Sequence, residues 1–117
     1  MMRCLFLAAA LMSLALPAAA AELRGLDKVS GQARTFKAQL NQPVTFGSLR
    51  IVVRACQQRP PEETPPEAAA YLTVTETRGE GAKKDDPIFQ GWMFASSPAL
   101  NALEHPTYDV WVISCNN

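Results

Sequence analysis

The chain has 117 residues with 11 basic and 11 acidic side chains, which gives a formal net charge of zero. This balance argues against nucleic acid or an anionic membrane as an obligatory partner, because both favour clearly basic surfaces. The length allows one small domain and leaves no room for a second one.

The N-terminus has the three parts of a secretory signal peptide. Arg3 provides the positive start, an apolar run extends from Cys4 to Leu16, and small residues follow from Pro17 to Ala21. The apolar run is shorter than the stretch of about 20 residues that a membrane-spanning helix needs. We therefore expect export of the chain to the periplasm.

Cleavage is expected after Ala21, so that residues 1–21 form the signal peptide, and a cut one residue earlier is the alternative. Removing 21 of the 117 residues leaves 96, with 10 basic and 11 acidic side chains. Residues 22–117 are then expected to form one soluble periplasmic β domain that does not insert into the membrane.

The mature chain keeps two of the three cysteines, Cys56 and Cys115. In an oxidising compartment, an isolated pair in a small domain is most simply a structural disulfide. A metal site or a catalytic thiol is the alternative, but the chain has no CxxC motif and a single histidine. We expect the disulfide, which contributes about 4 kcal/mol on the chain-entropy model, and no metal or other cofactor.

Residues 22–33 mix charged residues with two glycines and are expected to be a lead-in segment. The pattern changes at Arg34, because Phe36, Ala38 and Leu40 alternate with polar residues. Such alternation predicts a β-strand that is buried on one face only.

A second strand is predicted from Ser48 to Ala55, with apolar residues on one face and Arg50 and Arg54 on the other. Strict alternation would place Cys56 on the arginine face. The strand must therefore end before this cysteine, or a β-bulge must turn the cysteine inward.

Two exposed loops are expected on either side of a third strand. The first loop, residues 57–68, holds four prolines and three glutamates, and proline lacks the N–H group that a central strand donates. The strand spans Ala70–Thr75, which is rich in β-branched and aromatic residues. The second loop, residues 77–87, is charged and contains glycine.

Two further strands, Ile88–Phe94 and Tyr108–Cys115, are apolar on both faces. Strands of this kind are usually covered on both faces, so we expect both to be central. The sequence contains no amphipathic helix of useful length. The patterns together predict an all-β domain of about six strands, a small sandwich or a flattened barrel.

The segment between these two strands is expected to serve packing. Ser97 followed by Pro98 is typical of a helix start, and the proline after His105 ends the turn. One short helical turn is therefore predicted here. Three aromatic residues on the flanking strands are assigned to the structural core: Trp92, Phe94 and Trp111.

Enzymatic interpretations of the same segment are weaker. Ser96 or Ser97 with His105 and Asp109 could form a hydrolase triad, but no glycine-flanked nucleophile elbow is present. A metal site from Glu104, His105 and Asp109 has no stronger support. We therefore expect no catalytic residue and no metal site, and a Ser/His/Asp hydrolase is the least favoured function.

The composition between Gly91 and Trp111 favours a binding function. Trp, Met, Phe, Tyr and Pro are concentrated there, and a domain of about 100 residues cannot readily hide so much apolar surface. Because aromatic residues and Met are enriched at interfaces, we expect a non-enzymatic module that binds or stabilises an envelope protein. The expected interface residues are Pro98, Leu100, His105, Pro106 and Tyr108.

The alternative is a small-ligand or glycan-binding β domain. Trp92 and Trp111, with Tyr71 and Tyr108, could present an aromatic platform for sugar rings. In small β domains, however, aromatic side chains more often belong to the core. A broad exposed apolar patch would favour the partner-binding module, whereas a concave pocket lined by rings would favour ligand binding.

Four segments carry a resemblance to a known family: LRGLDKVSG, FGSLRIVVRAC, PPEETPPEAAA and, above all, GWMFASSPALNALEHPTYDVWVISC. Through them the sequence resembles the domain of unknown function 2155 family, small exported proteins of Gram-negative bacteria. The resemblance covers essentially the whole mature chain and implies no activity, ligand or catalytic residue. Members are often encoded beside a protein that resembles an accessory subunit of respiratory complex I, so a candidate partner is the periplasmic face of an inner-membrane complex.

Overall fold

The computed structural model describes residues 19–78 and 86–116. In these two ranges the chain forms seven β-strands and no helix. Most of the predicted signal peptide and most of the predicted loop at residues 77–87 lie outside the described residues. The strands are β1 (Ala20–Asp27), β2 (Ala33–Gln39), β3 (Val44–Phe46), β4 (Leu49–Gln58), β5 (Ala68–Glu76), β6 (Pro87–Phe94) and β7 (Tyr108–Asn116).

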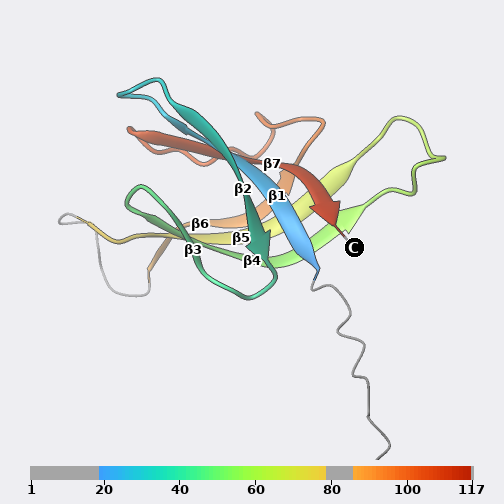
Figure 1. Cartoon of the computed structure of the whole chain (residues 1–117), viewed down its shortest axis with the longest axis horizontal. Helices are drawn as coiled ribbons and strands as arrows, with labels where there is room; N and C mark the ends of the chain where they lie inside the picture. The colour runs from blue at the N-terminus through green and yellow to red at the C-terminus, as the bar shows by residue number, and fades with distance from the viewer. Residues whose placement is uncertain (1–18, 79–85, 117) are drawn as a thin grey trace, which may run out of the picture.

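The strands form two antiparallel sheets. One sheet has the order β2-β1-β7, and the other has the order β3-β4-β5-β6. The sheets pack face to face, with the three-stranded sheet in front of the four-stranded sheet in Figure 1. The predicted all-β sandwich is therefore confirmed, with seven strands in place of about six.

The core fills the space between the sheets because alternate residues of each strand point inward. In β5, for example, Ala70, Leu72 and Val74 are fully buried, whereas the residues between them are half-buried. Burying each large aliphatic side chain contributes about 1.5–3 kcal/mol. The largest fully buried side chains are Leu23, Leu49, Ile51, Val53, Leu72, Val74 and Val112.

Strand β1 lies in the segment that the sequence predicts as a lead-in, and it is the central strand of its sheet. Its buried positions include Leu23 and Gly25. A Cβ atom built on Gly25 would lie 2.6 Å from the ring of Phe46, so only glycine fits under this ring without a shift. Because glycine carries no apolar side chain, the sequence of β1 does not show the alternation of apolar and polar residues that indicates a strand.

The beginning of β1 overlaps the predicted signal peptide. Ala20 and Ala21 are both buried, and Ala21 lies opposite Ala38 in β2 and Cys115 in β7. Cleavage after Ala21 would remove both alanines from the strand, whereas the alternative cut would keep Ala21. Both cleavage sites remain predictions.

Strands β6 and β7 are edge strands, not the central strands that the sequence predicts. Their buried positions are filled by residues such as Met93 and Val112, and their second apolar face is a partly exposed outer face of the sandwich. Trp92 is 36% exposed, and Phe94 and Trp111 are half-buried outside the core cluster. The assignment of these three aromatic residues to the core is therefore wrong.

A β-bulge places Cys56 in the core. The register between β4 and β5 shifts between Val53 and Ala55, so that Arg54 is the extra residue and the side chains after it change faces. Cys56 is consequently buried, which confirms one of the two sequence-based alternatives. Strand pairing continues beyond the cysteine, so the predicted loop at residues 57–68 is shorter than expected.

The predicted helical turn is only a single hydrogen-bonded turn. The N–H of Leu100 donates to the carbonyl of Ser97 (3.0 Å), but the chain does not continue as a helix. The side chain of Asn101 donates to the Trp92 carbonyl (2.7 Å), and Leu103 is buried in the core. These two contacts hold the segment along β6.

Candidate functional site

The five predicted interface residues fall into two environments. Pro98, Leu100 and Pro106 are exposed, and Leu100 keeps 72% of its surface in solvent. His105 and Tyr108 are half-buried and stack on each other, with ring centroids 5.3 Å apart. The exposed group can contact a partner directly, whereas the half-buried pair belongs to a network at one end of the sandwich.

Both ring nitrogens of His105 are engaged in this network. Nδ1 lies 3.0 Å from the backbone N of Thr107 and 3.1 Å from that of Tyr108, and Nε2 lies 2.7 Å from Oε2 of Glu76. Because Nδ1 accepts two N–H groups, we assign the proton to Nε2, which donates to Glu76. Partial burial raises the pKa of Glu76, but the hydrogen bonds from Ser48 and His105 outweigh this effect and lower the pKa below its usual value.

The residues of the conceivable hydrolase triad have other partners. His105 has no free acceptor for a serine proton, because its Nδ1 faces two backbone amides. Ser96 donates its hydroxyl to Glu67, and Asp109 pairs with Lys28 at 3.2 Å. His105 therefore links the end of β5 to the start of β7, and the geometry shows no relay from serine through histidine to Asp109.

Aromatic rings close the same end of the sandwich. Phe46 stacks on Phe36 (5.5 Å between centroids) and meets Tyr108 edge-on (5.6 Å). The guanidinium of Arg34 lies 5.6 Å from the centroid of the Phe46 ring. Gly47 permits this arrangement, because its φ is +57° and a Cβ there would lie 2.3 Å from the Tyr108 ring.

A pocket of about 540 Å³ opens beside these rings, and we call it the ring pocket. Its rings come from Phe46 and Tyr108, and its cation comes from Arg34. A planar ligand with a carboxylate could use both features, since rings stack on planar groups and guanidinium binds carboxylates. The lining residues are Asp27, Gln32, Ala33, Arg34, Phe46, Gly47 and Tyr108.

The outer face of the four-stranded sheet carries exposed apolar residues around β6. Tyr71 of β5 meets Trp92 of β6 edge-to-face at 5.6 Å, which fixes both rings on the sheet. Ile88 and Trp92 are 40% and 36% exposed, and the turn that contains Leu100 is hydrogen-bonded to the Trp92 carbonyl. We define the β6 surface as Tyr71, Ile88, Trp92, Phe94 and Leu100. Sequence reasoning found the turn but placed Trp92 inside.

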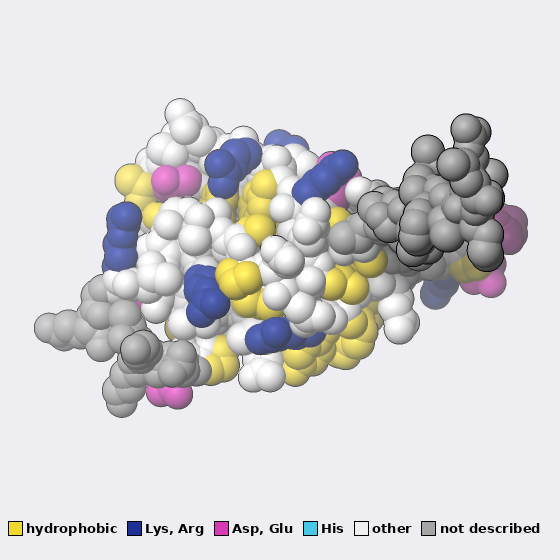
Figure 2. All heavy atoms as spheres, turned by 60° about the horizontal axis from the view of Figure 1, so that its bottom comes forward, with side chains coloured by type: hydrophobic (Ala, Val, Ile, Leu, Met, Phe, Trp, Pro, Cys, Tyr) yellow, Lys and Arg dark blue, Asp and Glu magenta, His cyan; other side chains and the backbone are white. Residues whose placement is uncertain are grey.

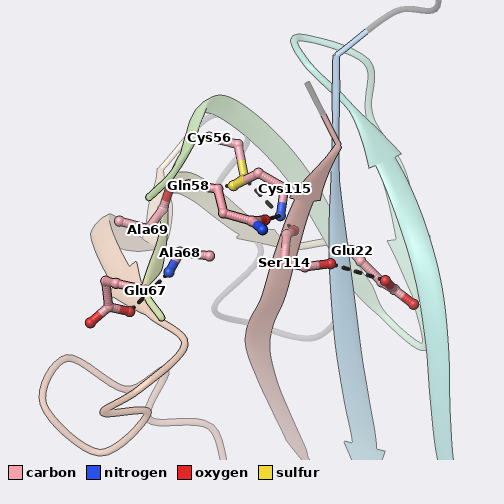
Figure 3. Close-up of a disulfide and its surroundings, with 8 residues drawn as sticks. All are labelled: Glu22, Cys56, Gln58, Glu67, Ala68, Ala69, Ser114 and Cys115. Atoms are coloured by element: carbon pink, nitrogen blue, oxygen red, sulfur yellow. Dashed lines mark hydrogen bonds between the residues drawn. A yellow bond between two sulfur atoms is a disulfide. The ribbon is translucent and has the colours of Figure 1, made fainter. Parts of the chain in front are cut away.

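The opposite end of the sandwich holds the disulfide between Cys56 and Cys115 (Figure 3), as predicted. Their Cα atoms are 5.7 Å apart, and the bond joins β4 and β7, which belong to different sheets and run toward the same end in Figure 1. Gln58 accepts the backbone N–H of Cys115 (2.9 Å), and Ser114 donates its hydroxyl to Glu22 (3.0 Å).

Hydrogen bonds to Glu67 hold the end of the proline-rich loop beside the disulfide. Glu67 accepts the backbone N–H groups of Ala68 (3.0 Å) and Ser96 (3.2 Å) and also the Ser96 hydroxyl. The hydroxyl of Ser96 is the main reason that the pKa of Glu67 is lowered. A groove of about 500 Å³ lies between this loop, Ala95 and the exposed Ile113 of β7. Sequence reasoning missed Glu67, because its partner is 29 residues away.

Within residues 19–78 and 86–116 no helix is long and apolar enough to cross a membrane. No group of three or more His, Cys, Asp or Glu side chains lies close enough to hold a metal ion there. The expected absence of a cofactor remains a prediction.

Comparisons with known proteins place the chain in a family. The family model "Uncharacterized protein conserved in bacteria (DUF2155)" matches residues 21–115. The chain is 27% identical over 90 residues to "Uncharacterized protein RP359" of Rickettsia prowazekii (strain Madrid E), which covers 77% of this chain and 56% of the relative. The chain thus spans little more than half of that relative's length, and no solved structure matches it. Because the family model spans most of the sequence, the chain belongs to the DUF2155 family.

Proposed function

We propose that the protein is a non-enzymatic, periplasmic module that binds an envelope protein through the β6 surface. The observation that carries the proposal is the grouping of exposed apolar side chains at one edge of the sandwich. Residues 19–78 and 86–116 contain five exposed large hydrophobic residues, and three of them, Ile88, Trp92 and Leu100, belong to this surface. Exposed apolar surface of this kind commonly marks a protein interface.

The rigidity of Trp92 supports a role in recognition. Tyr71 packs against its ring, and Asn101 holds the backbone carbonyl of the same residue. A ring that is already fixed loses little conformational freedom on binding, and Trp is enriched among the residues that dominate interface energies.

Two features support an envelope location. The N-terminal sequence has the pattern of a signal peptide, and the disulfide between Cys56 and Cys115 is the kind of bond that persists in oxidising compartments. The periplasmic face of an inner-membrane complex remains the candidate partner, and this choice rests on the family context described above.

The test is co-purification of envelope proteins with tagged variants, produced in cells and crosslinked before lysis. Trp92→Ala should remove a specific partner, with a loss of affinity of at least tenfold, as expected for an interface residue that contributes about 2 kcal/mol. Val29→Ala is the matched control, because Val29 is 83% exposed but lies in the turn between β1 and β2. Equal recovery of the partner by both variants would contradict the proposal.

A small-ligand function is the second candidate, and the ring pocket is the observation that favours it. The pocket combines two rings with one guanidinium, as expected for a site that binds planar acids. A panel of aromatic and sugar carboxylates can be tested by thermal shift. Stabilisation that is lost in Arg34→Ala and kept in Trp92→Ala would support the ligand-binding function over the partner-binding one.

A further inference from the structure

The edges of the two sheets differ in how far their main-chain groups are open. An edge strand presents every second pair of N–H and C=O groups to its surroundings, and such a row can pair with a strand of another chain. Within residues 19–78 and 86–116 the edge strands are β2 and β7 in one sheet and β3 and β6 in the other. Native proteins usually shorten or cover such edges.

Three of these edges are short or partly covered. Strand β3 has only three residues. At β6, the side chain of Asn101 donates to the Trp92 carbonyl. At β7, the side chain of Gln58 accepts the N–H of Cys115, and residues 98–103 share a small pocket with the middle of the strand.

Strand β2 is the long edge that remains, with seven residues paired to β1 alone. Two main-chain bonds at its ends show which of its groups point outward. The N–H of Leu40 donates to the carbonyl of Ala19 (3.1 Å), and the N–H of Asp27 donates to the carbonyl of Gln32 (2.9 Å). The register between these two bonds has no bulge. Because bonded and non-bonded pairs alternate in an antiparallel ladder, every second residue of β2 bonds to β1.

The open groups belong to Thr35 and Lys37. Counted in steps of two from either end, the residues bonded to β1 are Arg34, Phe36 and Ala38. Thr35 and Lys37 therefore direct their N–H and carbonyl groups away from the sheet. The main chain of neither residue has another hydrogen-bond partner in the described part of the chain.

We infer that the edge of β2 binds an extended, acidic segment of another protein, which adds a fourth strand to the β2-β1-β7 sheet. In this mode of recognition the main-chain hydrogen bonds supply affinity, and the side chains along the edge supply specificity. Thr35 and Lys37 offer two donors and two acceptors in the spacing of a β-ladder.

The side chains of β2 favour carboxylates on the added strand. The strand carries Arg34 and Lys37 and no acidic residue. Lys37 points to the outer face of the sheet, opposite Glu22 of β1, and Arg34 lies on the inner face, 5.5 Å from the centroid of the Phe36 ring. Neither cation forms a salt bridge among the described residues. An added strand would therefore meet one cation on each face, and opposite charges on neighbouring strands stabilise their pairing.

This arrangement predicts the sequence pattern of the bound segment. In an antiparallel pair, four successive residues of the added strand face Lys37, Phe36, Thr35 and Arg34 in that order. Facing residues point to the same side of a sheet. Acidic residues therefore suit the first and fourth positions, and an apolar residue suits the second. Glu-Val-Thr-Glu has this pattern.

The same charges argue against a second copy of β2 as the occupant. Two copies would bring four cationic side chains and no carboxylate to the shared edge, and like charges on neighbouring strands are destabilising. An added strand would also leave the β6 surface free, because β2 lies at the opposite edge of its sheet from β7, the strand that packs against β6.

The test uses the purified, exported protein labelled with ¹⁵N and a blocked synthetic peptide with Glu-Val-Thr-Glu at its centre. The peptide should shift the amide signals of Thr35 and Lys37 and slow their hydrogen exchange. N-methylation of the first and third peptide residues removes the donors that face β2 and should weaken binding about tenfold. N-methylation of the second and fourth residues, which point away, should weaken it less than about threefold. Equal weakening, or unchanged signals from Thr35 and Lys37, would overturn the inference.

The role of charge is tested by exchanging the signs. Lys37→Glu should weaken binding of the Glu-Val-Thr-Glu peptide about fivefold, because an attractive cross-strand pair becomes repulsive, and should strengthen binding of Lys-Val-Thr-Glu. Lys and Arg side chains also lie among hydrophobic and uncharged ones elsewhere on the surface, as Figure 2 shows, so a matched control is needed. Arg50→Glu makes the same change of charge on β4 and should alter affinity less than about threefold.

Thermal unfolding establishes that each variant is folded. Equal effects of Lys37→Glu and Arg50→Glu would overturn the inference, since they would indicate attraction to total charge. Slow exchange of the Thr35 and Lys37 amides without peptide, in protein that dimerises, would assign the edge to a second copy and would also overturn it. None of these results affects the test of the β6 surface with Trp92→Ala.

Discussion

The position of Gly25 beneath the Phe46 ring allows a quantitative test of how the sandwich is packed. In Gly25→Ala the added Cβ would lie 2.6 Å from Cε2 and Cζ of Phe46, well inside the usual contact distance of about 3.5–4 Å. The ring cannot move away freely, because Phe36 stacks on it and Tyr108 meets it edge-on. We therefore expect a loss of about 3 kcal/mol in the free energy of unfolding, the upper part of the usual range for overpacking.

Urea unfolding of the oxidised protein, followed by circular dichroism, measures this loss. The decisive comparison is a double-mutant cycle with Phe46→Leu, because the smaller side chain leaves room for the new methyl group. In that background Gly25→Ala should cost less than about 1 kcal/mol, which corresponds to a coupling energy of about 2 kcal/mol. A Gly25→Ala variant as stable as the parent, or a cost that is equal in both backgrounds, would refute the packing argument.

Three further predictions concern the rest of the fold. Cys56→Ser/Cys115→Ser should lower the free energy of unfolding by about 4 kcal/mol, and urea midpoints unchanged from those of the oxidised parent would contradict this. Leu103→Ala should lower the free energy of unfolding by about 2–5 kcal/mol, because Leu103 is 4% exposed. Leu100→Ala in the same segment should lower it by less than about 0.5 kcal/mol. Similar melting temperatures for the two variants would show that Leu103 does not anchor the segment. The folded-state pKa of Glu76 lies below its usual value of 4.5. The ionised Glu76 therefore contributes its full stabilisation above pH 4.5, and this stabilisation is lost as the pH falls through the lowered pKa. Glu76→Gln should make the free energy of unfolding depend less steeply on pH in the acidic range.

The features that were predictable from the sequence are those set by local alternation. The strand from residue 48, its arginine face and the choice between a strand end and a bulge before Cys56 all follow from one period-two pattern. The structure selects the bulge and gives the position of the extra residue, Arg54. The disulfide was predictable for a different reason, because only two cysteines, Cys56 and Cys115, follow the expected signal peptide.

The features that were missed depend on contacts between distant segments. Strand β1 is hidden because Gly25 replaces an apolar side chain at a position that the Phe46 ring fills. The exposure of Trp92 depends on the two-layer sandwich, in which each strand has one outer face, and a strand that is apolar on both faces gives no information on which face points outward. The bonds from Glu76 to His105 and from Glu67 to Ser96 each span 29 residues and depend on the final strand register.

The central claim is that the β6 surface binds an envelope protein, and site-specific photo-crosslinking in living cells tests it most directly. A photoreactive amino acid placed at position 100, which is exposed next to Trp92, should give one discrete adduct with an envelope protein. The same amino acid at position 29, which is more exposed (83% against 72%) but lies in the turn between β1 and β2, should give none. Adducts of the same mass from both positions, or no adduct from position 100 in a folded and exported protein, would contradict the claim.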